Sequence, residues 1–198
     1  MDSSAVALSA WSYGLVGLAY SGFALRLLQL GYLKSLREGF KISLLAAVSL
    51  SAAWGWLELS WVQSGRPIFF SLGALADLLR YGSWLGFLLL MLRANTAESS
   101  RSSLARMGAV AGLLLGLGLL GLVSGTLGYV SRLSLLISMV LPVFSMMLLE
   151  QLFRNATEDS RWNIKPLCLG LATAFLFDLY LYSEAVLFNR PDNDALSI

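Results

Sequence analysis

Histidine is absent from the 198-residue sequence. Its absence excludes haem held by histidine, histidine zinc sites, Ser-His-Asp catalysis and a phospho-accepting histidine within the chain. Cysteine occurs once, as Cys168, so no intramolecular disulfide can form and a small packing residue is expected there. We therefore expect no catalytic residue, no metal site and no cofactor in this chain.

Charged residues are also scarce. They make up 13% of the sequence against 57% hydrophobic residues, and the mean hydropathy is +0.71. This composition is typical of polytopic membrane proteins. The net charge of +2 gives no indication of nucleic-acid binding. The lysines Lys34, Lys41 and Lys165 all lie at the ends of hydrophobic runs, so none can hold retinal in the middle of a membrane.

The sequence predicts an all-α integral membrane protein with a single transmembrane domain over 1–198. A bilayer is crossed by about 20 apolar residues per helix. Runs of this kind cover 9–33, 40–63, 69–92, 105–127, 129–153 and 165–188. Asp2, in place of basic residues, precedes the first run, which is too long for a signal peptide, so it is expected to be a true helix.

Proline and basic residues give further expectations. Pro67 and Pro166 suit the first turns of the third and sixth helices, and Pro142 predicts a kink in the fifth. Basic residues gather after the first, third and fifth runs, which places both termini outside the membrane. These residues are Lys34, Arg37, Lys41, Arg93, Arg101, Arg106, Arg154, Arg161 and Lys165, against Arg66, Arg132 and Arg190 on the other side.

Ionisable residues inside the runs are the candidate site. Each costs about 2.5–3.5 kcal/mol in the middle of a membrane, so it must be paired, face a cavity or have a function. Helical spacing places Asp77, Arg80 and Tyr81 on one stripe, and Asp178 with Tyr182 on another. The predicted signal-sensing or ligand-binding residues, most of them in the outer half of the bundle, are Glu58, Asp77, Arg80, Tyr81, Asp178, Tyr182 and Glu184.

Acids outnumber bases in this set. Three arrangements could neutralise the excess of acids. A cation or amine binds from outside, some acids are protonated because they are buried, or the side chains of Arg66 and Arg132 reach the site. The arrangement expected has Asp178 and Tyr182 facing Asp77 and Arg80, with Glu184 near the aqueous rim. A buried network that only fixes helix packing, a ligand- or proton-responsive site and a transport path all remain open.

The run 105–127 carries small residues at helical spacing. Gly108, Gly112, Gly116, Gly121 and Gly125 predict close helix packing, as in small-xxx-small contacts. Packing within the chain and homodimerisation are the two alternatives.

Part of the sequence resembles a known family. The residues are Glu150 to Asn155, Arg161-Trp162, Ile164-Lys165, Leu167 to Gly170 and Asp178 to Ala185. They are similar to the membrane region of PrsK-type sensor histidine kinases of the PEP-CTERM/exosortase system. Over 1–149 the likeness is chiefly one of helix pattern.

The resemblance implies a sensor region, in the bacterial inner membrane, for an envelope or lipid-borne signal. In that family a GAF domain and an ATP-binding kinase core follow further membrane helices and signal to a PrsR-type response regulator. No such core is found before Ile198, so ATP and the regulator would be met only through a core outside this chain. The chain itself is then no enzyme, and membrane lipid is its direct partner. A small transporter and a membrane assembly subunit are the alternatives.

Overall fold

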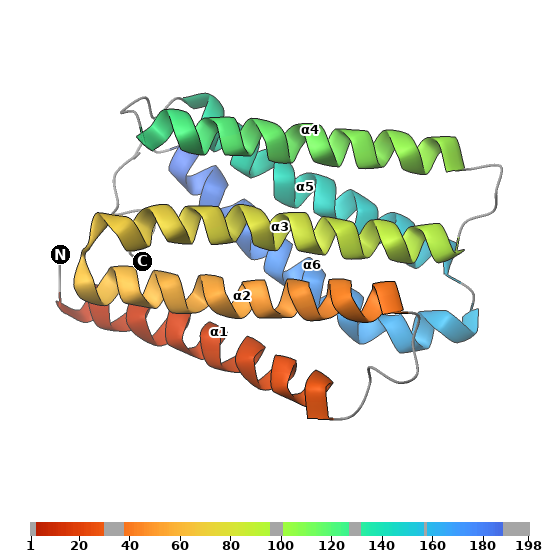
Figure 1. The fold of residues 1–198 in the computed structure, drawn as a ribbon, viewed down its shortest axis with the longest axis horizontal. Helices are drawn as coiled ribbons and strands as arrows, with labels where there is room; N and C mark the ends of the chain where they lie inside the picture. The colour runs from red at the N-terminus through yellow and green to blue at the C-terminus, as the bar shows by residue number, and fades with distance from the viewer. Residues whose placement is uncertain (1–2, 30–37, 96–100, 127–131, 157, 188–198) are drawn as a thin grey trace. The chain divides into compact units, whose positions relative to one another are not determined.

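A computed structural model describes residues 3–29, 38–95, 101–126, 132–156 and 158–187, which are helical except at Gly65, Arg66 and Ala156. No strand occurs in these ranges, so the prediction of an all-α protein is confirmed. The helices, labelled in Figure 1, are α1 (Ser3–Gln29), α2 (Glu38–Ser64), α3 (Pro67–Asn95), α4 (Arg101–Thr126), α5 (Arg132–Asn155) and α6 (Glu158–Leu187).

Helices α2 to α6 are the described helices that are long and apolar enough to cross a membrane. Their spans are Gly39–Ser64, Pro67–Ala94, Ser102–Val123, Leu136–Asn155 and Ile164–Ser183. Five of the six predicted spans therefore meet the requirement. Helix α1 has 27 residues, but its sequence is interrupted by serines, Arg26 and Gln29. Its crossing of the membrane stays a prediction.

Helix α6 begins well before its predicted start. It starts at Glu158, so Pro166 lies inside the helix and the prediction that Pro166 stands in the first turn is wrong. Proline inside a helix removes one backbone donor and crowds the preceding turn, at a cost of about 3 kcal/mol, yet α6 continues through Pro166. Glu158 and Asp159 give the new start two acidic residues, which the helix dipole favours. The predicted helix limits at 33, 127, 129 and 188 lie outside the described residues.

The helices form two compact units, which are described separately. The first unit contains α1, α2 and α3 as far as Trp84. Helix α1 packs against α2. At their crossing, a Cβ atom built on Gly55 would lie 2.9 Å from the backbone nitrogen of Gly17, so the two helix backbones touch. The buried residues of this unit include Ala47, Val48, Ser51, Ala52, Ala76, Arg80, Tyr81 and Trp84.

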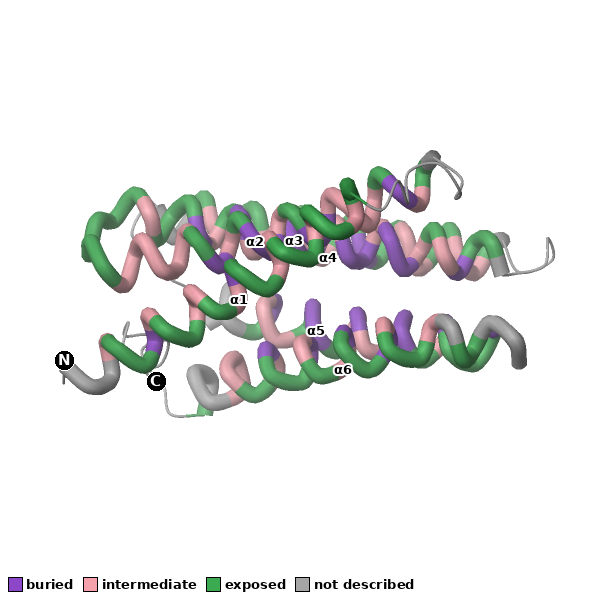
Figure 2. The backbone as a smooth tube through the Cα atoms, turned by 90° about the horizontal axis from the view of Figure 1, so that it is seen from below, coloured by how far each residue is buried: buried purple, intermediate pink, exposed green. Residues whose placement is uncertain are grey.

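The second unit begins at Leu85 in α3 and contains α4, α5 and α6. Helix α5 packs against both α4 and α6. Pro142 is fully buried inside α5, and the Ser145 hydroxyl donates to the carbonyl of Leu141 at 2.8 Å. Buried residues appear as short bands between exposed ones along the helices in Figure 2. This pattern leaves large apolar side chains exposed, as expected where helices meet lipid.

Candidate functional site

A tight turn joins α2 to α3 and sets which of their residues meet. Gly65 follows α2 with a φ of 60°, a conformation that glycine adopts without strain. Its N–H donates to the carbonyl of Trp61 at 2.8 Å, which is the hydrogen bond of an αL helix end. Helix α3 then begins at Pro67, as predicted. The turn therefore folds α3 back along α2.

Close to this turn, residues at equal distance from it lie opposite one another. The rings of Trp61 and Phe70 are 5.5 Å apart between centroids. Further from the turn, the Trp84 indole N–H donates to the Ser51 hydroxyl at 3.1 Å, and both residues are buried. These contacts fix the register of the hairpin at its two ends. The ionisable residues of the candidate site lie between them.

Asp77 and Arg80 form an ion pair on α3. The Arg80 Nη2 atom lies 2.7 Å from Asp77 Oδ1, and Arg80 Nε donates to the same oxygen at 3.0 Å. Only 9% of the Arg80 side chain and 17% of the Asp77 side chain are exposed. The i,i+3 spacing predicted this pair. Arg80 is residue 14 of the 29 in α3 (80 − 67 + 1 = 14), so the pair lies near the middle of the span.

Two aromatic rings lie beside the Arg80 guanidinium. Its Cζ atom is 4.3 Å from the centroid of the Trp54 ring on α2 and 5.0 Å from that of Tyr81 on α3. Tyr13 of α1 packs edge-on against Trp54, with centroids 5.8 Å apart. A cation over a ring face gains about 2 kcal/mol when it is removed from water. All three helices of the first unit therefore contribute to the surroundings of one charge.

Glu58 lies against a glycine of the neighbouring helix. A Cβ atom built on Gly73 would be 2.5 Å from Glu58 Oε1, so the carboxylate occupies the space that a side chain would fill. No hydrogen bond within the described part of the chain involves Glu58. The sequence indicated Glu58 but not Gly73. Pairing residues that are equally far from the α2–α3 turn would have found it, because Glu58 and Gly73 both lie 7.5 positions from the midpoint between residues 65 and 66.

The residues predicted on α6 belong to the second unit. Asp178 is buried, with 7% exposure, and Tyr182 is half-buried. Tyr180 of the same helix is 60% exposed, so the buried Asp178 and the exposed Tyr180 differ in their surroundings. Glu184 is within α6, but its side chain lies outside the described residues. The expected pairing of Asp178 and Tyr182 with Asp77 and Arg80 stays a prediction.

The two arginines that were candidates for neutralising the acids differ in what the structure describes of them. Arg66 is exposed at the α2–α3 turn, and the Arg132 side chain lies outside the described residues. Within the described ranges, no three His, Cys, Asp or Glu residues gather as a metal site would require.

The glycines of α4 have open space around them. Cβ atoms built on Gly108, Gly112 and Gly116 meet no described atom within 4 Å. The side-chain surroundings of Gly125 lie outside the described residues, and Gly121 makes contacts of its own. Close helix approach through this ladder stays a prediction. The close approach observed is at Gly17 and Gly55, which the sequence reading did not select.

Comparison with known proteins adds no relative to this description. The chain matches no family model, no curated protein and no solved structure. The resemblance to PrsK-type sensor kinases therefore rests on the residues given above. Over the residues that it describes, the structure shows an all-helical protein with several helices long and apolar enough to cross a membrane.

Proposed function

We propose that this chain is the membrane sensor region of a bacterial histidine kinase, with the Asp77–Arg80 cluster as its signal-responsive element. One observation carries the proposal: an ion pair that is more than four-fifths buried lies near the middle of a membrane-spanning helix. Ionised groups at that depth are costly and are generally retained for a function.

The cluster is suited to respond to movement between helices. Asp77 and Arg80 both lie on α3, whereas Trp54 and Glu58 lie on α2. Sliding of α2 along α3 would therefore leave the ion pair intact but would change the contact between Trp54 and Arg80. It would also move the Glu58 carboxylate away from Gly73. A signal must favour one of these arrangements over the other, since equal affinity for both shifts nothing.

The proposed topology follows from the basic residues in the loops. Both termini are placed outside the inner membrane. In this topology α1 also crosses the membrane, which brings the number of crossings to six. Docking of α1 against α2 through Gly17 and Gly55 supports this role for α1. Output reaches a response regulator through a kinase core beyond this chain, and Asp178 and Tyr182 on α6 are the proposed relay.

The relay is tested by autophosphorylation. The full-length gene product is assayed with labelled ATP in membrane vesicles, as wild type and as Asp178→Asn. We expect basal phosphorylation to change about fivefold or more, in line with coupling free energies of about 1 kcal/mol upward. Glu150→Gln is the matched control, because Glu150 is an acid on α5 whose side chain is 67% exposed.

Equal phosphorylation of the Asp178→Asn protein and the control would remove α6 from the proposal. Absence of ATP-dependent phosphorylation in the wild type would overturn the assignment to a histidine kinase. Solute flux in reconstituted vesicles would then favour the carrier alternative.

A further inference from the structure

The turn between α5 and α6 is held by one arginine. Arg161, in the first turn of α6, donates from Nε to the carbonyl of Ala156 at 3.1 Å and from Nη2 to that of Arg154 at 3.3 Å. Basic side chains commonly satisfy the last carbonyls of a helix in this way. The guanidinium also lies 5.8 Å from the ring centroid of Phe153. Arg161 is thus fixed in position beside the end of α5.

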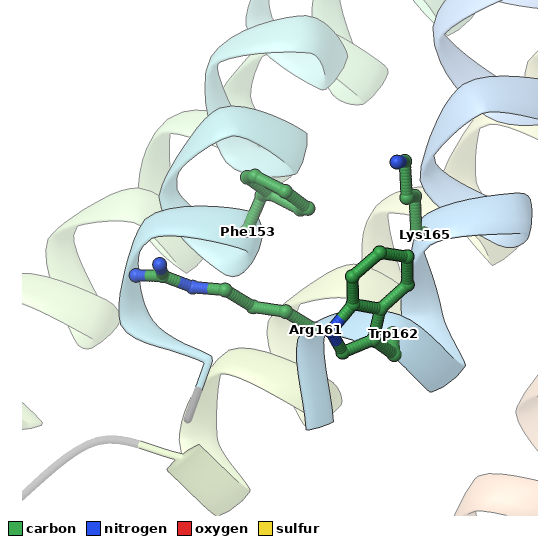
Figure 3. Close-up of a pocket in the computed structure, with 4 residues that line it drawn as sticks. All are labelled: Phe153, Arg161, Trp162 and Lys165. Carbon is green, nitrogen blue, oxygen red and sulfur yellow. The ribbon is translucent and has the colours of Figure 1, made fainter. Parts of the chain in front are cut away.

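A pocket of about 400 Å³ opens at this turn, within the second unit. Phe153, Arg161, Trp162 and Lys165 line it. Figure 3 shows Phe153 and Arg161 on one side, and Lys165 above the indole of Trp162 on the other. The lining therefore combines two cationic side chains with two aromatic rings.

The pocket presents two cations. Lys165 Nζ lies 5.0 Å from the ring centroid of Trp162, and among the described side chains no acid forms an ion pair with Lys165 or Arg161. An anion bound in the pocket would interact favourably with both cations. A phosphate group fits a guanidinium and an ammonium of this kind.

The surroundings favour a lipid as the source of that phosphate. Trp162 is 75% exposed at the start of a membrane span, where tryptophan marks the interface with the headgroups. Leu169 and Leu176 follow Lys165 at i+4 and i+11 on the same helix face, and both are exposed. This stripe offers acyl chains a path directly below the pocket. Basic pockets between helices at the cytoplasmic side are known to hold anionic lipid headgroups.

We propose that the pocket lined by Phe153, Arg161, Trp162 and Lys165 binds the phosphate of an anionic phospholipid headgroup. The site is at the end of the α5–α6 hairpin that the basic residues place in the cytoplasm. It shares no residue with the Asp77–Arg80 cluster, and its test does not depend on kinase output.

The test is lipid binding by the purified full chain in nonionic detergent. Phosphatidylglycerol and phosphatidylcholine are titrated in parallel, and retained lipid is counted by native mass spectrometry. We expect phosphatidylglycerol to be retained in preference to phosphatidylcholine, and Lys165→Gln to weaken its retention about fivefold. Lys165→Arg keeps the charge and should retain the lipid. Arg106→Gln, an exposed cation on α4, is the matched control and should also leave binding unchanged.

Each result decides the proposal. Loss of preference in Lys165→Gln alone supports it, and a denaturation midpoint equal to that of Lys165→Arg shows that the variant is folded. Equal retention of the two lipids, or equal weakening by Arg106→Gln, overturns it. Displacement of phosphatidylglycerol by inorganic phosphate would assign the pocket to free phosphate and would also overturn the lipid proposal.

Discussion

Asp77→Asn should lower the free energy of unfolding by about 3 kcal/mol, because it removes the acid from a largely buried ion pair with Arg80. The Trp54 and Tyr81 rings remain beside the guanidinium and offset part of this loss. Denaturation of the purified protein from mixed micelles measures the difference. The effect comes from a buried charge, so added salt should screen little of it.

Two further comparisons, a double variant and an exposed ion pair, make this prediction specific. The double variant Asp77→Asn/Arg80→Gln removes both charges and should lose less stability than Asp77→Asn alone. The exposed pair Glu150–Arg154 is the internal control, with side chains 67% and 76% exposed and atoms 3.5 Å apart. Glu150→Gln should change stability by about 0.5 kcal/mol at most. Equal effects of Asp77→Asn and Glu150→Gln would contradict the buried ion pair.

Gly55→Ala should separate α1 from α2 and lower the free energy of unfolding by about 1–3 kcal/mol. The added Cβ would lie 2.9 Å from the Gly17 nitrogen and 3.1 Å from its Cα, and backbone atoms cannot move aside as a flexible side chain does. In a Cys168→Ala background, Ser9→Cys reports the movement. Ser9 on α1 is 2% exposed in the native fold, so maleimide labelling should become faster when α1 undocks.

Gly22→Ala provides the comparison on α1 itself. A Cβ atom there meets nothing within 4 Å, so the variant should be neutral or more stable by up to about 1 kcal/mol through helix propensity. Loss of stability in both variants, with equal labelling of the Ser9→Cys reporter, would show that α1 is not held through Gly55.

The sequence predicted the helices well, because long apolar runs separated by basic loops leave few alternatives. The α2–α3 turn was also readable from Ser64-Gly65-Arg66-Pro67, where glycine and proline have distinct roles. The start of α6 was misjudged at Pro166, since a proline at the first helical position and one within an established helix look alike in a single sequence. Charges at Glu158 and Asp159 were the better signal.

The candidate site was predictable in part. Asp77 and Arg80 lie on one helix, so their spacing alone predicted the pair. Contacts between helices required the register of the hairpin, which brings the Trp54 ring of α2 over Arg80 of α3. Gly73 was missed because glycine has no side chain that would indicate a site. Its role becomes visible only once Glu58 is known to lie opposite it.

Glycine spacing gave the weakest guide to packing. The ladder at Gly108, Gly112 and Gly116 drew attention because it repeats along one helix face, but its glycines face open space in the described residues. Gly17 and Gly55 lie on different helices and form no repeat, so their meeting depends on how α1 crosses α2. How two helices cross depends on both of them, so it cannot be predicted from the sequence of one helix.

Autophosphorylation of the Arg80→Gln protein, measured against Arg93→Gln, tests the sensor proposal most directly. Both substitutions remove an arginine from α3, but Arg80 is buried in the cluster and Arg93 is exposed in the last turn. We predict that Arg80→Gln changes basal phosphorylation of the full-length gene product about fivefold or more, and that Arg93→Gln stays close to wild type. Equal phosphorylation of wild type and both variants, at equal protein content in the vesicles, would contradict a signalling role for the cluster.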